Sequence, residues 1–210
     1  MSKKFLIIAT IIMIFLSSSM TFASTIKEKA SVAVMDFGIH SEAVPIDINI
    51  FNAGKTASEY VIDDLVKSNK FDVMDRFMVE DKIKAEHLNT TGIIDPDTAK
   101  RIGQILGVKY IIYGNVNDVT LSEVNTDIGL SDVTVCTVKS HLILRMMEVE
   151  TGNIVCIAKG EGKSKSSGTS VLLIEVGSDK VTQNSVHNAI KQASAQTVNI
   201  LTTRLYGNKK

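Results

Sequence analysis

Residues 91–116, TGIIDPDTAKRIGQILGVKYIIYGNV, hold the strongest structural signal in this sequence. Asp95 suits the N-cap of a helix, Pro96 its first position, and Gly107 a left-handed C-cap. Small or apolar residues recur between them at spacings of three and four, on one helix face: Ala99, Ile102, Gly103 and Leu106. Residues 110–113 follow as a run of β-forming residues. This stretch therefore predicts a helix, a glycine turn and a buried strand, packed as helix on sheet.

The same two periodicities predict the other elements. The predicted strands are 31–37, 71–76, 110–113, 133–149 and 154–159, with Gly38 and Gly114 ending the first and third, and the predicted helices are 52–68, 77–88, 96–106 and 185–205. The predicted loops are 39–50, 115–131 and the low-complexity segment 160–170, and 171–176 is a short apolar run. The order βαβααβββα predicts an α/β fold in a single domain, with a mixed β-sheet flanked by helices.

Each predicted helix has one face that we expect to be buried. The expected buried residues are Ala57, Val61 and Leu65 in the first helix, Met78, Ile83 and Leu88 in the second, and Val186, Ala189, Ile190, Ala193, Thr197, Ile200 and Leu201 in the last. Asn69 is expected to end the first helix.

The first 23 residues have the pattern of a secretory signal peptide. Lys3 and Lys4 precede an apolar run at 5–16, and small or polar residues follow at 17–23. The alternative is a retained membrane anchor, but a spanning helix needs about 20 apolar residues and this run has roughly 12. We therefore expect cleavage after residue 23, a flexible N-terminus at 24–30, and an exported, periplasmic protein.

The composition argues against nucleic acid as a partner. The chain has 23 basic and 23 acidic residues, and two of the basic ones lie in the predicted signal peptide. No basic stripe with interleaved aromatic residues is present, whereas nucleic-acid binding depends on clustered positive charge.

Gly54, Lys55 and Thr56 resemble the end of a phosphate-binding loop. That motif requires a glycine five residues before Gly54, where this sequence has Asn49. The three residues are therefore interpreted as the start of a helix, with a loop lysine.

No residue set predicts catalysis or metal binding. The histidines lie in four different predicted elements, without the spacing of metal ligands: His40, His87, His141 and His187. Asp75 and Arg76 end a predicted strand, where binding is one role and an ion pair with a neighbouring element is the more ordinary one. We therefore predict no catalytic, cofactor-binding or metal-binding residues, no cofactor, and no enzymatic activity.

The two cysteines, Cys136 and Cys156, are predicted to remain free thiols. A hairpin turn at 151–152 would place Met147 opposite Cys156, so that Cys136 lies 11 residues further along its strand. That separation corresponds to about 36 Å, far beyond the reach of a disulfide.

Several segments, taken in order, resemble the CsgG family, named for the outer-membrane component of curli assembly. They are VAVMDFG at 32–38, FDVMDR at 71–76, TAKRIGQILGVKYIIYGNV at 98–116, LILRMMEVETGNIV at 142–155 and the amphipathic helix at the end of the chain. The resemblance assigns 31–207 to a CsgG-like domain. It implies a non-enzymatic protein with a mixed α/β sandwich.

The sequence departs from that family in two ways. Members are typically lipoproteins acylated on an N-terminal cysteine, but here no cysteine precedes Cys136. Channel-forming members insert transmembrane β-hairpins, and the corresponding segments, 116–138 and 160–184, lack a clean apolar alternation. We therefore expect a water-soluble domain that forms no pore by itself. Outer-membrane association stays open, but not through a lipidated cysteine.

The resemblance implies one of two functions. The first is a component of an outer-membrane-linked system that assembles or secretes extracellular fibres or similar cargo. The alternative is a periplasmic regulatory module, similar to the LpoB-type activators of peptidoglycan synthases. Both imply envelope proteins as partners, either secretion and assembly partners or a peptidoglycan synthase, and both leave a homo-oligomer open.

Overall fold

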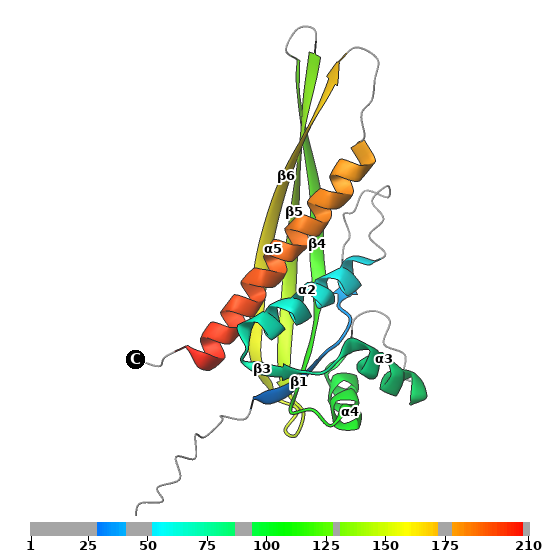
Figure 1. The fold of residues 1–210 in the computed structure, drawn as a ribbon, viewed down its shortest axis with the longest axis vertical. Helices are drawn as coiled ribbons and strands as arrows, with labels where there is room; N and C mark the ends of the chain where they lie inside the picture. The colour runs from blue at the N-terminus through cyan, green and yellow to red at the C-terminus, as the bar shows by residue number, and fades with distance from the viewer. Residues whose placement is uncertain (1–28, 41–51, 87–93, 128–130, 172–177, 208–210) are drawn as a thin grey trace, which may run out of the picture.

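The computed structural model describes residues 29–40, 52–86, 94–127, 131–171 and 178–207 (Figure 1). Its elements are β1 (Ala30–Val34), β2 (Gly38–Ile39), α2 (Ala53–Ser68), β3 (Phe71–Val73), α3 (Arg76–Ala85), α4 (Pro96–Leu106), β4 (Tyr110–Asp127), β5 (Ser131–Glu148), β6 (Ile154–Val171) and α5 (Ser178–Tyr206). The sheet has the order β3-β1-β4-β5-β6, with β2 paired beside β1 on β4. β1 is parallel to β3 and β4, whereas β4, β5 and β6 are antiparallel. The predicted mixed sheet and α/β class are confirmed.

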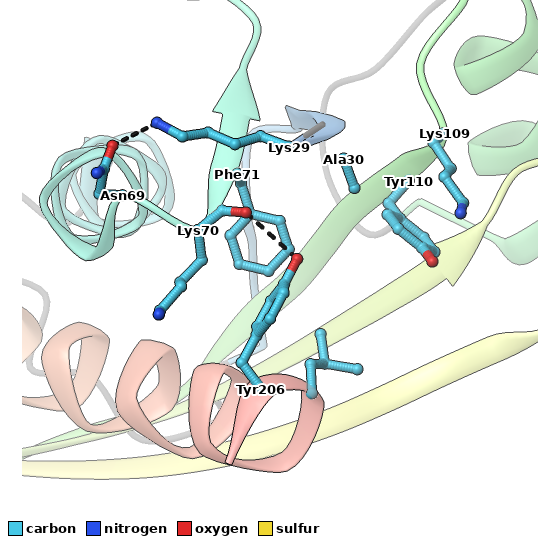
Figure 2. A pocket seen from close by; sticks show the side chains of 9 residues that line it. Lys29, Ala30, Asn69, Lys70, Phe71, Lys109, Tyr110 and Tyr206 are labelled. Carbon is cyan, nitrogen blue, oxygen red and sulfur yellow. Dashed lines mark hydrogen bonds between the residues drawn. The ribbon is translucent and has the colours of Figure 1, made fainter. Parts of the chain in front are cut away.

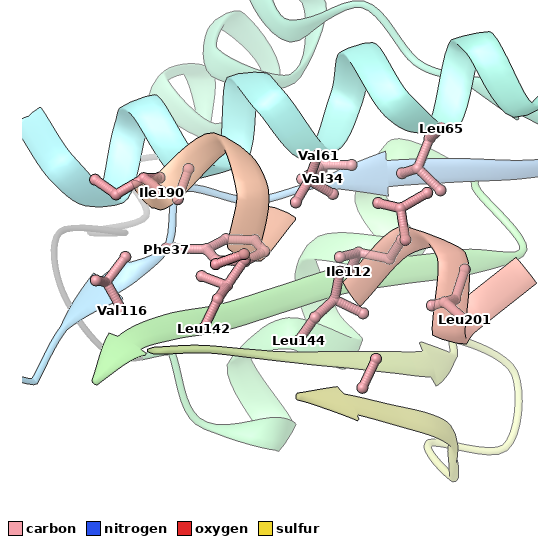
Figure 3. Close-up of a cluster of buried hydrophobic side chains, with 14 of the residues drawn as sticks. Val34, Phe37, Val61, Leu65, Ile112, Val116, Leu142, Leu144, Ile190 and Leu201 are labelled. Atoms are coloured by element: carbon pink, nitrogen blue, oxygen red, sulfur yellow. The ribbon is translucent and has the colours of Figure 1, made fainter. Parts of the chain in front are cut away.

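Two layers of helices cover the sheet, because alternate residues of each strand point to opposite faces. Val32 and Val34 pack in a cluster with side chains of α2 and α5, while Ala33 and Met35 pack with side chains of α3 and α4. Figure 3 shows the first cluster, in which residues of β1, β4 and β5 meet those of α2 and α5. Most of the residues that the sequence predicts to be buried on the three helix faces are buried in the structure: Ala57, Val61, Leu65, Ile83, Val186, Ala189, Ile190, Ala193, Thr197 and Leu201.

Helix α4 has the bounds and caps that its sequence predicts. The carboxylate of Asp95 accepts a hydrogen bond from the backbone N–H of Thr98 at 3.0 Å, and Gly107 adopts a left-handed φ of 69°. A Cβ atom on Gly103 would lie 2.4 Å from Cγ2 of Val149. The glycine therefore allows the helix to approach the end of β5 closely.

Residues 115–127 and 160–170 form strands and not the predicted loops. β4 continues through Gly114 to Asp127, and β6 continues to Val171. Both lengthened strands pair with β5, which satisfies their backbone hydrogen-bonding groups. A β-bulge between Val116 and Asp118 shifts the alternation of β4, which explains why the sequence there does not show one strand period.

Several boundaries also differ from the prediction. The strand predicted at 31–37 ends at Val34, and Gly38, which was predicted to end it, begins the separate strand β2. β3 is shorter than 71–76 because Asp75 caps α3. Met78 is 54 % exposed rather than buried, and Val79 takes the inward position. Helix α5 begins at Ser178, earlier than expected. Leu88 and most of the loop predicted at 39–50 lie outside the described residues.

The predicted hairpin register is wrong. The turn pairs Glu148, not Glu150, with Asn153, which shifts the register by two residues. A bulge between Met146 and Met147 restores one of them, so that Met146, not Met147, lies opposite Cys156. Cys136 lies opposite Ser166 on the same two strands, far from Cys156. Cys156 is a buried free thiol, as predicted.

Candidate interaction surface

Of the residues that the structure describes, those that the sequence offers as candidates for catalysis or metal binding do not form one site. Among the described residues, no group of three or more His, Cys, Asp or Glu side chains could hold a metal ion. His141 lies on β5 and His187 on α5, and His40 follows β2. His87 lies outside the described ranges.

The Gly54-Lys55-Thr56 segment has a structural role at the start of α2. Gly54 is buried, and a Cβ atom there would lie 1.9 Å from the carbonyl oxygen of Phe37. Lys55 is half-exposed and lies 3.9 Å from Glu80 in an ion pair. The helix-start interpretation of this segment is confirmed.

Arg76, at the start of α3, connects this helix with α2 and with the segment that follows β1. Its guanidinium bonds the carboxylates of Asp36 and of Glu80, the latter at 3.0 Å, and donates to the hydroxyl of Ser58 at 2.9 Å. The side chain is only 14 % exposed. The ion pair predicted for Asp75-Arg76 is therefore formed by Arg76, while Asp75 accepts hydrogen bonds from the first backbone N–H groups of α3.

The long strands β4, β5 and β6 extend beyond the region covered by α4 (Figure 1). One face of this extension packs against α5, and every second residue of β6 is buried there: Cys156, Ala158, Gly160, Gly162 and Ser164. The intervening residues of β6 are exposed. We call the uncovered side the open face and define it by Asp118, Lys139, His141, Ile157, Lys159, Glu161 and Lys163.

A row of three titratable side chains crosses the open face. Asp118, His141 and Glu161 lie directly opposite one another on β4, β5 and β6. The imidazole Nδ1 is 3.7 Å from the Asp118 carboxylate, and Nε2 is 3.9 Å from that of Glu161. Both distances are too long for hydrogen bonds. They are ion-pair contacts only in the protonated form of the imidazole.

The next row is positively charged. Lys139 and Lys163 lie opposite each other on β5 and β6, and both are exposed. The row of Asp118, His141 and Glu161 lines a shallow hollow of about 450 Å³, which also reaches Lys159. Ile157, 41 % exposed, adds an apolar side chain to the lower end of the face. Alternating charge next to an apolar contact is the chemistry of protein–protein interfaces, where complementary charges set specificity.

Tyr113 and Arg145 lie on the same side of the sheet, opposite each other and in one row with Ile157. Tyr113 is buried, and burial raises the pKa of its phenol, while the Arg145 guanidinium acts in the opposite direction. The phenol oxygen has no hydrogen-bond partner among the described residues.

Helix α5 also covers the outer edge of β6. The amide oxygens of Gln196 and Gln192 accept hydrogen bonds from the backbone N–H groups of Glu161 and Lys163, at 2.6 Å and 3.3 Å. Lower down, Arg204 donates to the carbonyl of Ile157. These contacts satisfy groups that an edge strand otherwise presents to other chains.

Sequence reasoning missed the open face and the covered edge. The signal for them is the spacing of small residues in GEGKSKS, residues 160–166, where Gly160, Gly162 and Ser164 alternate with charged residues. Such alternation is the pattern of a strand whose one face meets a close helix.

None of the described helices has the length and hydrophobicity required to cross a membrane.

Comparisons with known proteins place this geometry in context. The family model "Curli production assembly/transport component CsgG" matches residues 16–209. No curated protein matches the sequence.

Three solved structures are similar to the chain. The LpoB C-terminal domain from Salmonella enterica has 15 % identity, covers 63 % of this chain and 81 % of its own, and gives a TM-score of 0.44. Lipoprotein GNA1162 from Neisseria meningitidis has 16 % identity, coverages of 85 % and 99 %, and a TM-score of 0.41. The PelC dodecamer from Paraburkholderia phytofirmans has 13 % identity, coverages of 81 % and 86 %, and a TM-score of 0.37.

Proposed function

Because the chain belongs to the CsgG family, we propose that it is a non-enzymatic component of an envelope system that assembles or secretes extracellular fibres or similar cargo. The family match over residues 16–209 is the observation that carries this proposal. It agrees with the signal peptide predicted at the N-terminus, which would export the mature chain to the periplasm with Ser24 as its first residue.

The open face is the part of the chain that we assign to partner contact. It carries carboxylates, an imidazole and lysines in neighbouring rows, and α5 covers the other side of the same strands. A partner with complementary charges would be oriented along these rows, since charge complementarity favours one register over others. Ile157 supplies apolar area that such a partner would bury.

A photo-crosslinking experiment in the native host tests the proposal. A photoreactive amino acid replaces Lys163 on the open face, and, in the control variant, Lys67 on α2, whose side chain is 68 % exposed. Crosslinked proteins are identified by mass spectrometry after fractionation of periplasm and membranes. The same preparation shows whether the mature N-terminus is Ser24.

Each outcome decides between functions. Crosslinks from position 163 to assembly or secretion proteins, absent from position 67, support the proposal. Crosslinks to a peptidoglycan synthase would instead favour the regulatory alternative implied by the LpoB resemblance. Equal crosslinking from both positions would contradict the assignment of the open face, and recovery in the cytoplasm would contradict the envelope function.

A further inference from the structure

Three of the parallel strands of the sheet are each preceded by a lysine. Lys29 precedes β1, Lys70 precedes β3 and Lys109 precedes β4. Neighbouring parallel strands start at the same edge of a sheet, and here Ala30 lies opposite Phe71. The topology therefore brings together three lysines that are far apart in the sequence.

The three lysines surround a cleft of about 360 Å³ at this edge (Figure 2). Aromatic and apolar side chains form much of the remaining wall: Phe71, Tyr110, Leu205 and Tyr206. No Asp or Glu is among its lining residues. The cleft thus combines positive charge with aromatic surface.

The aromatic rings hold two of the ammonium groups at the cleft. Nζ of Lys70 lies 5.9 Å from the centre of the Tyr206 ring, and Nζ of Lys109 lies 5.3 Å from that of Tyr110. Both distances are within the range of cation–π attraction. Tyr206 is fixed in turn by an edge-to-face contact with Phe71 at 5.4 Å and by donation from its hydroxyl to the carbonyl of Lys70 at 3.3 Å.

The charge of the lysines is not neutralised within the described part of the chain. Lys29 donates to the neutral amide of Asn69, and no described carboxylate forms an ion pair with any of the three. Helices α2 and α5 both end beside the cleft, and each C-terminus carries about half a negative charge. The three ammonium groups carry three positive charges, and the two helix C-termini offset about one of them. An excess of about two positive charges therefore remains at the cleft.

We propose that this cleft binds a phosphate group attached to an apolar or aromatic moiety. A phosphate monoester carries about −1.5 to −2 charges at neutral pH, which matches the excess positive charge. Lysines bind phosphate oxygens as point charges, whereas a carboxylate is held best by the fork of an arginine, and none lines the cleft. The monoester headgroup of phosphatidic acid and soluble phosphate monoesters share this chemistry. The inference does not depend on the function proposed above.

The test uses protein purified from the native host as the cell processes it. The site variant is Lys29→Gln/Lys70→Gln/Lys109→Gln, and the control is Lys55→Gln/Lys84→Gln/Lys191→Gln, which removes the same charge from exposed positions elsewhere. The soluble probes are phenyl phosphate and inorganic phosphate. The membrane probes are phosphatidylcholine vesicles with and without phosphatidic acid, whose headgroup is a phosphate monoester. Tyrosine emission reports binding, because the chain has no tryptophan.

We expect saturable binding by the wild-type protein and by the control variant, with affinity lower by about tenfold or more in the site variant. Phenyl phosphate binding identifies a soluble ester as the source, and binding only to vesicles that contain phosphatidic acid identifies a headgroup. Equal losses in both variants, or no saturable binding to any probe, would overturn the proposal.

A second measurement needs no variant. Acetylation of lysines in the wild-type protein, followed by mass spectrometry, should slow at Lys29, Lys70 and Lys109 when the bound probe is present, and remain unchanged at Lys84. Unchanged acetylation at the cleft lysines at saturating probe would refute the site even if the triple variant does not fold.

Discussion

The amide oxygen of Gln196 accepts a hydrogen bond from the backbone N–H of Glu161 at 2.6 Å, so a helix side chain takes the place of a neighbouring strand. Gln192, one turn earlier on α5, does the same for Lys163. β6 is the last strand of the sheet in this direction, and its edge is closed by glutamines instead of being left open to other chains.

Replacing both glutamines should therefore reopen the edge. For Gln192→Ala/Gln196→Ala we expect faster amide hydrogen exchange at Glu161 and Lys163, and concentration-dependent self-association in sedimentation experiments. Each lost hydrogen bond should cost about 0.5–1 kcal/mol of folding free energy. The matched control is Asn199→Ala, at an exposed position of the same helix. Unchanged exchange at both amides would show that the glutamines do not protect the edge.

Gly162 should not tolerate a side chain. A Cβ atom there would lie 1.8 Å from the carbonyl oxygen of Ala189, so Gly162→Ala forces α5 away from β6. We expect a loss of about 2–4 kcal/mol in the free energy of unfolding by urea, since overpacking against backbone cannot be relieved by a rotamer change. Lys163→Ala, on the other face of the strand, should change the free energy of unfolding by less than about 0.5 kcal/mol. A Gly162→Ala protein as stable as wild type would mean that α5 packs differently.

Arg76 should contribute more to stability than any exposed ion pair of the same region. Arg76→Met removes contacts to Asp36, Glu80 and Ser58 and should cost about 1–3 kcal/mol, at the lower end because both carboxylates are partly exposed. Lys84→Met removes only an ion pair at 3.9 Å whose lysine is 73 % exposed, and should cost less than about 0.5 kcal/mol. Urea unfolding measures both, and equal effects would rule out a special role for Arg76.

Asp95 should make the stability of the fold depend on pH in the acidic range. Hydrogen bonds from the Thr98 side chain and then from its backbone N–H lower the pKa of Asp95 below 3.8. Because the folded-state pKa is the lower one, the contribution is complete above the unfolded-state pKa and is lost as the pH falls through the folded-state value.

Asp95→Asn keeps an acceptor at the N-cap but cannot titrate. Its stability relative to wild type should be constant above about pH 5 and should converge toward that of wild type at lower pH. Thr98→Val should raise the pKa of Asp95 toward 3.8, as followed by NMR titration. A stability difference that does not change with pH would contradict the lowered pKa.

Both cysteines should titrate as free thiols in denatured, non-reduced protein. Cys136 lies opposite Ser166 and Cys156 opposite Met146, so they stand ten residues apart along the β5–β6 pairing. This corresponds to about 33 Å, beyond the reach of a disulfide. Recovery of a peptide linking Cys136 to Cys156 would disprove the register of the hairpin.

The sequence predicts well those features that depend on neighbouring residues. The caps of α4 are decided by Asp95 and Gly107, and the buried face of α2 by Ala57, Val61 and Leu65. Each needs only local periodicity and backbone preference. The partners of Arg76 could be predicted in kind but not in identity, because Asp36 reaches it only through the parallel pairing of β1 with β3.

The open face could not be predicted because it depends on register across three strands. The hairpin register expected from the turn places His141 opposite Gly162. The observed turn instead pairs Glu148 with Asn153, two residues away from the expected register, and the bulge beside Met146 restores one of the two, so that His141 lies opposite Glu161. The bulge after Val116 hides the continuation of β4 in the same way. A shift of one residue moves every side chain to the other face, so local pattern alone does not define such a surface.

The position of β1 inside the sheet has a consequence for the order of folding. β1 is the first of the described strands, yet its neighbours are β3 and β4, and Val32 lies opposite Tyr110. By contrast, β4, β5, β6 and α5 follow one another directly. Closing long loops slows folding, so the consecutive C-terminal elements should assemble first and receive β1 afterwards. Of the described strands, the one synthesised first should therefore be among the last to take its place in the sheet.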